Sequence, residues 1–167
     1  MGSSNRRKLT HVARGRRGSE SRMVDVGSKP VTSRSALARA RVRFPPGLLE
    51  VVLREGGPKG PVTEVARAAG VLAAKRTGEL IPMCHPLALD HVEVRFEPAG
   101  GDLEILCRAS TRGRTGVEME ALVGASLAAL TVYDMVKGLD HGISIGSVEL
   151  LEKRGGRSGA WRRGDGG

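Results

Sequence analysis

The chain has 167 residues, which is enough for one compact domain with its own hydrophobic core. Only 2% of the residues are aromatic, so the core must be built from aliphatic side chains, and stacking platforms for single-stranded nucleic acid are scarce. The formal net charge of +9 is concentrated in the ends, because residues 1–22 carry a net +6 and residues 153–167 a net +4. We therefore expect a flexible basic arm over 1–22, one α+β domain over 23–153 and a flexible, basic, Gly-rich tail over 154–167.

The two cysteines, Cys84 and Cys107, have neither a metal-ligand spacing nor a disulfide framework, which favours reduced thiols in a cytoplasmic protein. The N-terminus lacks the apolar stretch of a secretory signal. The longest charge-free apolar run, over 121–133, is too short to cross a bilayer. We therefore expect a cytoplasmic protein with no membrane partner.

Arginine alternates with small or apolar residues over 38–44, which predicts a half-buried strand. Two prolines end this strand, and a short helix through Arg54 follows. Residues 56–61 predict a rigid, turn-rich loop. The helix predicted over 63–76 consists largely of Ala with one Gly; this composition either lets another backbone approach closely or simply reflects high helix propensity.

The second half of the chain begins with a strand at 92–96, which a Gly-Gly-Asp turn connects to a strand at 103–109. The apolar stretch over 120–136 predicts a long buried helix. A last strand over 143–151 is interrupted at Gly146, which suggests a bulge. This order of elements predicts an α+β fold, with an antiparallel or mixed sheet and helices packed on one face.

Three charged residues share one side of the long apolar helix. On a helical wheel, Asp134 lies about 40° and Lys137 about 100° from Glu120. Asp134 and Lys137 are also three residues apart, within reach of each other. Charged groups on an apolar helix are costly unless they are paired or functional. A surface salt bridge at the end of a core helix explains the pair equally well.

Glu118 and Glu120 allow two interpretations. In an extended segment they would share a face, and two neighbouring carboxylates would split their pKa values as acid–base pairs do. On a helix they would diverge by about 200° and serve as N-terminal acids that the helix dipole favours.

His85 follows Met83 and Cys84 in a segment that Pro82 and Pro86 hold in a fixed direction. A lone histidine is more often structural than catalytic. Adjacent Cys and His residues rarely chelate a metal ion together, so no metal site is expected here.

Two further lysines lie outside helix interiors, one in a predicted loop and one at the end of a predicted helix. Lys59 is carried by the Gly/Pro-rich loop, which presents its ammonium group to a partner, although the loop is not a phosphate-binding P-loop. Lys75 ends the helix over 63–76, where a cation usually complements the dipole and the last carbonyls.

Six segments resemble, in order and spacing, the cyclic pyranopterin monophosphate synthase family, which performs the second step of molybdenum cofactor biosynthesis. The resemblance covers residues 9–159. The matching segments are 23–26 with Lys29, 59–60, 73–87, 115–122, 130–137 and 151–159.

This resemblance implies a lyase that converts 3′,8-cyclo-7,8-dihydro-GTP into cyclic pyranopterin monophosphate and diphosphate. It also implies a ferredoxin-like subunit and a homohexamer, a trimer of dimers with the active site at the dimer interface. The implied partners are the small-molecule substrate and further copies of the chain, without a specific nucleic acid. No tightly bound cofactor is implied, and whether Mg²⁺ accompanies the substrate phosphates stays open.

The resemblance also implies functional residues, position by position. The catalytic candidates are Asp134, Lys137, Lys59 and His85. The substrate-binding candidates are Met83, Cys84, His85, Glu118, Met119, Glu120, Lys29, Lys75 and Lys153.

Roles for these residues are hypotheses. Asp134 and Lys137 suit acid–base work, with the pKa of Lys137 lowered if its site is apolar. Glu118 and Glu120 suit the guanidine-like edge of the base, because carboxylates complement paired N–H donors. Lys29, Lys59 and Lys153 suit the phosphates, and His85 suits orienting or protonating one of them.

Three other classes of function compete with this one. The basic ends suit a nucleic-acid-binding module whose affinity would depend strongly on salt. Lys137 alone suits a Schiff-base lyase. A structural oligomer without chemistry is the third, and it leaves the clustered charged residues unexplained.

Overall fold

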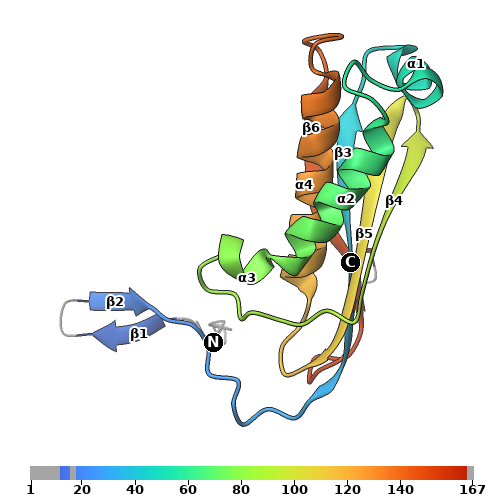
Figure 1. Cartoon of the computed structure of the whole chain (residues 1–167). Helices are drawn as coiled ribbons and strands as arrows, with labels where there is room; N and C mark the ends of the chain where they lie inside the picture. The colour runs from blue at the N-terminus through green and yellow to red at the C-terminus, as the bar shows by residue number, and fades with distance from the viewer. Residues whose placement is uncertain (1–11, 16–17, 165–167) are drawn as a thin grey trace, which may run out of the picture.

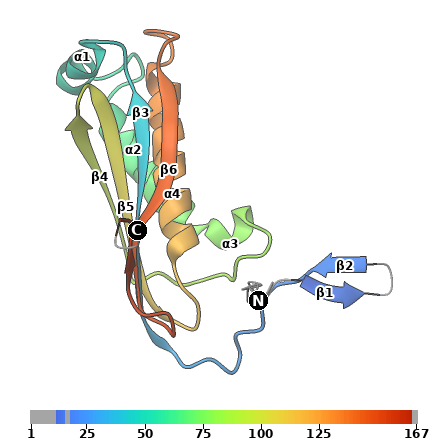
Figure 2. The same cartoon turned by 180° about the vertical axis from the view of Figure 1, so that it is seen from behind.

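The computed structural model describes residues 12–15 and 18–164. Five antiparallel strands form one sheet in the order β4-β5-β3-β6-β7. Helices α2 and α4 pack side by side on one face of it (Figure 1), and no described helix covers the other face (Figure 2). The predicted α+β fold with helices on one face is confirmed, whereas its ferredoxin-like subtype stays a prediction. The strands of the sheet are β3 (Thr32–Arg43), β4 (His91–Ala99), β5 (Asp102–Gly113), β6 (Ser144–Arg154) and β7 (Trp161–Arg162). The helices are α1 (Leu48–Glu55), α2 (Val62–Lys75), α3 (Thr77–Leu80) and α4 (Glu118–Val136).

The central strand β3 separates a small-residue core from a charged face. Ala36, Ala38, Ala40 and Val42 are buried beneath the helices, as strand alternation requires. The residues between them point to the open face, where Arg39 contacts both Glu104 and Glu149 of the neighbouring strands. The alternation in the sequence therefore marks the two faces of the sheet.

Two glycines let α2 and α4 touch backbone to backbone. A Cβ atom on Gly70 would lie 2.9 Å from the carbonyl oxygen of Gly124, and a Cβ atom on Gly124 would lie 2.6 Å from Sγ of Cys107 in β5. Neither position accepts a side chain without a shift of its neighbours. The close approach suggested by the Ala- and Gly-rich sequence of α2 is confirmed.

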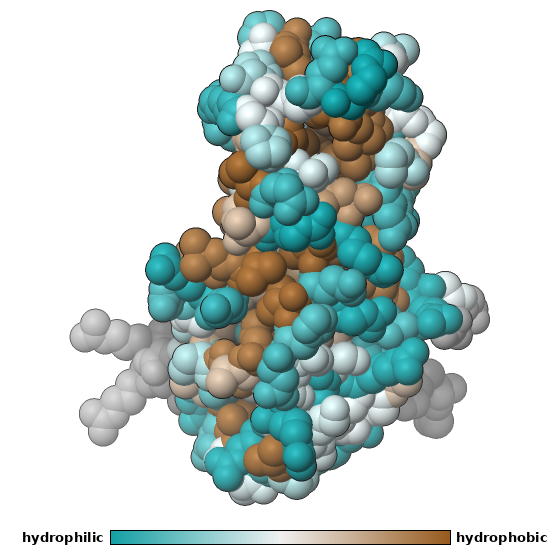
Figure 3. All heavy atoms as spheres, turned by 45° about the vertical axis from the view of Figure 1, so that its right-hand side comes forward, coloured by the Kyte–Doolittle hydropathy of each residue, from teal (hydrophilic) through white to brown (hydrophobic). Residues whose placement is uncertain are grey.

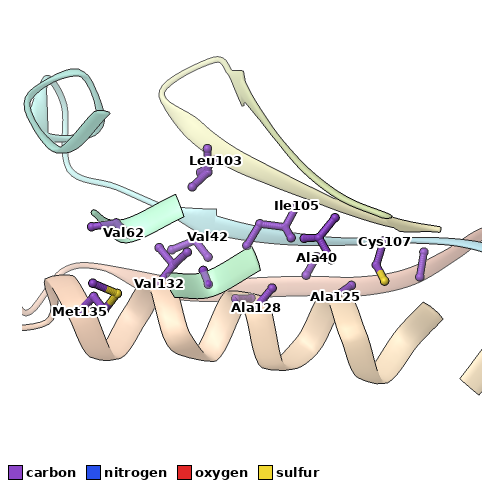
Figure 4. Close-up of a cluster of buried hydrophobic side chains, with 14 of the residues drawn as sticks. Ala40, Val42, Val62, Leu103, Ile105, Cys107, Ala125, Ala128, Val132 and Met135 are labelled. Atoms are coloured by element: carbon purple, nitrogen blue, oxygen red, sulfur yellow. The ribbon is translucent and has the colours of Figure 1, made fainter. Parts of the chain in front are cut away.

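Helix α4 is the core helix of the domain. It is apolar on nearly all sides, and its buried face packs on β3, β5 and β6 (Figure 4). By length and composition alone it would pass as a membrane span, but more than half of it is buried inside the chain, as in the core helix of a water-soluble fold. The apolar composition of α4 is therefore explained by its packing against the sheet and not by a membrane.

The sheet strands are longer than their sequence patterns indicate. Strand β3 begins at Thr32 and β5 runs on to Gly113, because these two residues pair with each other at the end of the ladder. Along β6, the partner of Ala40 is Val148 and that of Val42 is Ile145, so one extra residue lies beside Gly146. The predicted bulge is confirmed there.

The two ends of the chain contain further strands. In the arm, β1 (Val12–Gly15) and β2 (Gly18–Ser21) form an antiparallel hairpin that stands away from the sheet (Figure 1). In the tail, Trp161 and Arg162 form β7, which pairs with β6. The flexibility expected of residues 1–11 and 165–167 lies outside the described residues, as do Arg16 and Arg17.

Candidate active site

The candidate functional residues gather at the two opposite ends of α4. Asp134 and Lys137 lie at its C-terminal end, and Glu118 and Glu120 lie in its first turn. Glu120 and Asp134 are 14 residues apart in this helix, which separates them by about 21 Å along the axis. The helical wheel, which places the two residues about 40° apart, did not reveal this separation, nor that Glu120 is buried while Asp134 is half exposed.

At the C-terminal end, Lys59, Asp134 and Lys137 form what we call the lysine cluster. The two carboxylate oxygens of Asp134 each bind one ammonium group: Lys59 Nζ lies 2.7 Å from Oδ2 and Lys137 Nζ lies 2.8 Å from Oδ1. All three side chains are about half exposed. The i,i+3 pair expected from the sequence therefore exists, and Lys59 completes it from a distant loop.

The loop that carries Lys59 is held by its own backbone. Gly57 and Gly60 exchange two hydrogen bonds, with the N–H group of each donating to the carbonyl oxygen of the other at 3.0 and 2.9 Å. This small closed turn fixes where Lys59 leaves the loop. The rigid loop presents the ammonium group of Lys59 to Asp134, whereas a contact of Lys59 with substrate stays a prediction.

The charges of the lysine cluster are mutually stabilised. The hydrogen bond from Lys137, followed by that from Lys59, lowers the pKa of Asp134 to about 2. The same bond to Asp134 raises the pKa of Lys137 above its ordinary value. The hypothesis of a lowered pKa for Lys137 is wrong in this chain, because the ammonium group lies in solvent beside a carboxylate and not in an apolar site.

At the N-terminal end of α4, a hollow of about 350 Å³ forms what we call the carboxylate pocket. The segment between the two prolines lines one side of it and the first turn of α4 lines another. It collects most of the expected substrate-binding residues: Lys29, Met83, Cys84, His85, Glu118, Met119 and Glu120. His85, expected among the catalytic residues, therefore lies here and not with the lysine cluster.

Glu120 is the most deeply buried charged residue of the pocket, with only 3% of its surface exposed. Burial raises its pKa, and the negative charge of Glu118 raises it further. The pKa of the nearby Cys84 thiol is also raised, by burial first and then by the charge of Glu120. Of the described carboxyl groups that line this pocket, Glu120 is therefore the one whose protonation burial favours most.

The extended interpretation of Glu118 and Glu120 is wrong, because both lie in the first turn of α4. Their side chains diverge: that of Glu120 points into the fold, whereas that of Glu118 is partly exposed and lies 3.7 Å from Nζ of Lys153. The raised pKa of Glu120 thus arises mainly from burial.

Lys75 is placed apart from the other substrate-binding candidates. It lies at the end of α2 on a third hollow of about 310 Å³, which also includes Pro86 and the other side of Glu120. Glu120 therefore separates the carboxylate pocket from the hollow of Lys75.

A basic hollow beside the carboxylate pocket was not predicted from the sequence. It has a volume of about 490 Å³ and adjoins the carboxylate pocket, sharing Lys29, Thr115 and Gly116 with it. Its further cations are Arg34, Arg114 and Arg157, so we call it the arginine hollow. Arg157 belongs to the GGRSG segment over 155–159, which was expected to lie in the flexible tail.

The donor chemistry of these sites suits anions and proton transfer. Within residues 12–15 and 18–164, no group of three or more His, Cys, Asp and Glu side chains is arranged to hold a metal ion. The described charges instead offer ammonium and guanidinium groups to phosphates and carboxylates to N–H donors.

Comparisons with known proteins identify the family of the chain. The sequence model of the MoaC family matches residues 23–156. A protein from Chloroflexus aggregans named cyclic pyranopterin monophosphate synthase is 53% identical over 159 residues, which cover 93% of this chain and 94% of that protein. Proteins of the same name from Thermomicrobium roseum and Novosphingobium aromaticivorans are 54% and 51% identical, over 95% and 92% of this chain and 95% and 96% of their own lengths. The chain belongs to the MoaC family.

Proposed function

We propose that the chain is a cyclic pyranopterin monophosphate synthase of molybdenum cofactor biosynthesis. It converts 3′,8-cyclo-7,8-dihydro-GTP into cyclic pyranopterin monophosphate with release of diphosphate, as a phosphorus–oxygen lyase. The observation that carries this proposal is the identity of 51–54% to synthases of that name over more than nine tenths of the chain.

The lysine cluster supports a role in proton transfer. The reaction opens a purine-derived ring and recloses it as a pterin, which requires repeated protonation and deprotonation. Lys137 carries a proton at neutral pH, as lysine ordinarily does, and Asp134 holds that ammonium group in place at 2.8 Å. In this proposal Lys137 donates a proton to the substrate and its neutral amine then accepts one.

The cyclic phosphate forms in a displacement at the α-phosphate. A ribose-derived hydroxyl oxygen attacks the phosphorus atom, the bond to the bridging oxygen breaks, and the electron pair leaves with diphosphate. The hydroxyl proton passes to a base of the site. Lys59, Lys29, Lys153 and the cations of the arginine hollow are available to neutralise the phosphate charge.

The carboxylate pocket supports recognition of the base. Glu118 and Glu120 offer acceptors to the paired N–H groups of a guanidine-like edge, and His85 is available to a phosphate oxygen on the same hollow.

We also propose a homohexamer, a trimer of dimers, in which one active site combines the lysine cluster of one copy with the carboxylate pocket of another. Two features support this assembly. About 21 Å of helix separates the two groups within one chain, which is too far for one nucleotide to contact both. Both core helices also expose apolar side chains, Met119 and Leu130 on α4 and Val65 and Leu72 on α2. Figure 3 shows apolar surface gathered on one face of the molecule.

The proposed setting is the cytoplasm, with reduced thiols and no tightly bound cofactor. Mg²⁺ is a candidate companion of the substrate phosphates rather than a resident metal.

The test is to incubate the purified protein with 3′,8-cyclo-7,8-dihydro-GTP, with and without EDTA, and to follow diphosphate and pterin together. We expect both products from the wild type, and a loss of about 10²–10⁴-fold in Lys137→Ala. Glu50→Gln, an exposed change on α1, serves as the matched control and should leave the rate unchanged. Diphosphate without pterin contradicts the proposal, and near-normal turnover by Lys137→Ala contradicts the role of the lysine.

A further inference from the structure

The segment that was expected to be a loose tail begins with a turn that is packed tightly against β3. Gly155 and Gly156 have φ angles of +95° and +77°, a backbone conformation that favours glycine. A Cβ atom on Gly155 would collide with the carbonyl oxygen of Ser33, and one on Gly156 with the guanidinium group of Arg34. The start of the turn, at Gly155 and Gly156, therefore packs against the backbone of Ser33 and the side chain of Arg34.

This turn presents the hydroxyl group of Ser158 to a lysine of the site. Nζ of Lys153 donates a hydrogen bond to Oγ of Ser158 at 2.7 Å, and the same ammonium group lies 3.7 Å from Oε1 of Glu118. A further hydrogen bond, from the N–H group of Gly159 to the carbonyl oxygen of Gly156, closes the turn at 3.2 Å. Lys153 is thus held between a hydroxyl of the turn and a carboxylate of α4.

The contacts of Lys153 with Ser158 and Glu118 lie close to both hollows. Ser158 lines the arginine hollow, and Glu118 lines the adjoining carboxylate pocket. Lys29, Thr115 and Gly116 line both hollows, and Lys153, which lines neither, contacts one residue of each, so its ammonium group lies beside this junction. A lysine has a flexible four-carbon side chain, and a partner that fixes its end reduces the disorder that must be lost when an anion binds.

We propose that Ser158 is a positioning residue, which holds the ammonium group of Lys153 beside the junction of the two hollows, within reach of a phosphate group of the substrate. This inference rests on the proposed function, and it concerns binding of the phosphates and not the chemical step.

Kinetics separate a positioning role from a structural one. In Ser158→Ala we expect KM to rise about three- to tenfold while kcat stays within about twofold, because a hydrogen bond to a charged group is lost outside the chemical step. Ser158→Thr keeps the hydroxyl group and should restore KM. The matched control is Ser147→Ala, an exposed serine of β6 outside both hollows, which should change neither constant.

A double-mutant cycle tests whether Ser158 acts through Lys153. In a Lys153→Ala background, Ser158→Ala should raise KM by less than about twofold further, because its partner has already been removed. An unchanged KM in Ser158→Ala, an equal effect in both backgrounds, or no rescue by Ser158→Thr would overturn the inference.

Calorimetric binding of inorganic diphosphate to the full-length chain separates this inference from the proposed function. If the wild type makes no product, yet Ser158→Ala weakens diphosphate binding and Ser147→Ala does not, the positioning role stands and the proposed function fails. If the wild type makes both products and Ser158→Ala leaves diphosphate binding and KM unchanged, the positioning role fails alone.

Discussion

At its C-terminal end α4 carries Asp134 in solvent between two lysines, whereas in its first turn it carries Glu120 with only 3% of its surface exposed. The two carboxyl groups lie on the same helix and respond to their surroundings in opposite directions. Paired cations lower the pKa of Asp134 to about 2, while burial raises the pKa of Glu120.

This difference suits the two carboxyl groups to different tasks. Asp134 keeps its charge over the whole physiological range and is therefore suited to holding ammonium groups in place. Glu120 lies closer to protonation, so a bound ligand can change its charge at a smaller cost in free energy. Residue type alone does not distinguish the two, because the environment at each end of the helix decides the role.

The largest expected effect comes from mixing two variants, one altered at each end of α4, in the same oligomer. Lys137→Ala and Glu120→Gln should each be inactive alone. If one active site uses the lysine cluster of one copy and the carboxylate pocket of another, half of the randomly formed pairs are mixed and each mixed pair contains one intact site. Co-expressed variants should therefore recover about a quarter of the wild-type activity.

The measurement is diphosphate release by differently tagged, co-purified variants. The control combines Lys137→Ala with Asp134→Asn, two changes in the same cluster, which cannot complement each other. Full inactivity of the Lys137→Ala and Glu120→Gln mixture, with mixed oligomers present, would contradict the composite site.

A smaller effect should follow from disturbing the middle of α4, which holds both ends in register. In Gly124→Ala the new methyl group would meet Sγ of Cys107, and overpacking of this kind costs about 1–3 kcal/mol of unfolding free energy. Denaturant titration measures the loss.

Two companion variants make this prediction specific. Gly138→Ala, where no atom lies within 4 Å of a new Cβ atom, should leave the unfolding free energy nearly unchanged. Adding Cys107→Ala to Gly124→Ala makes room for the methyl group and should recover part of the loss. An equal loss in Gly138→Ala, which lies in the turn after α4, would show that the close contact with β5 does not control the result.

The smallest expected effect is a pH dependence of opposite sign at the two ends. The raised pKa of Glu120 means that the folded chain binds this proton more tightly, so its contribution to the unfolding free energy grows as the pH falls towards 4.5. The lowered pKa of Asp134 means that its contribution is present above pH 3.8 and is lost as the pH falls through about 2.

Denaturant titrations between pH 2 and 8 test this by difference from the wild type. Glu120→Gln should be more stable than the wild type at neutral pH, with the advantage shrinking on acidification. Asp134→Asn should be slightly less stable at neutral pH, with the deficit vanishing near pH 2. Difference curves that run in the same direction would contradict the assignment.

The sequence predicted the parts of this molecule that depend on local patterns. Alternation identified the buried face of β3, the Gly-Gly-Asp turn identified the β4–β5 hairpin, and Gly146 identified the bulge. The i,i+3 spacing identified the contact between Asp134 and Lys137. Each of these features involves residues that are near one another in the chain or in one ladder.

Features of the site that depend on contacts between distant residues were not predicted. The helical wheel predicted that Glu120 and Asp134 share a side of α4, but it contains no rise along the axis and no information on burial, so it hid their separation and their different environments. Lys59 meets Asp134 across 75 positions, and a lysine beside a carboxylate in solvent has a raised and not a lowered pKa. The arginine hollow forms where residues 29–34 meet residues 156–158, a contact that no local pattern reveals.

Two aromatic side chains, one in β7 and one in α4, can serve as spectroscopic probes of the two ends of α4. The one tryptophan of the chain, Trp161, is paired with Lys153, and the one tyrosine, Tyr133, directly precedes Asp134. Selective excitation of the indole ring therefore reports on the junction of the two hollows, while phenol absorbance reports on the lysine cluster. Ligand arrival at either end of α4 becomes visible in the unlabelled protein, without a dye or an added fluorophore.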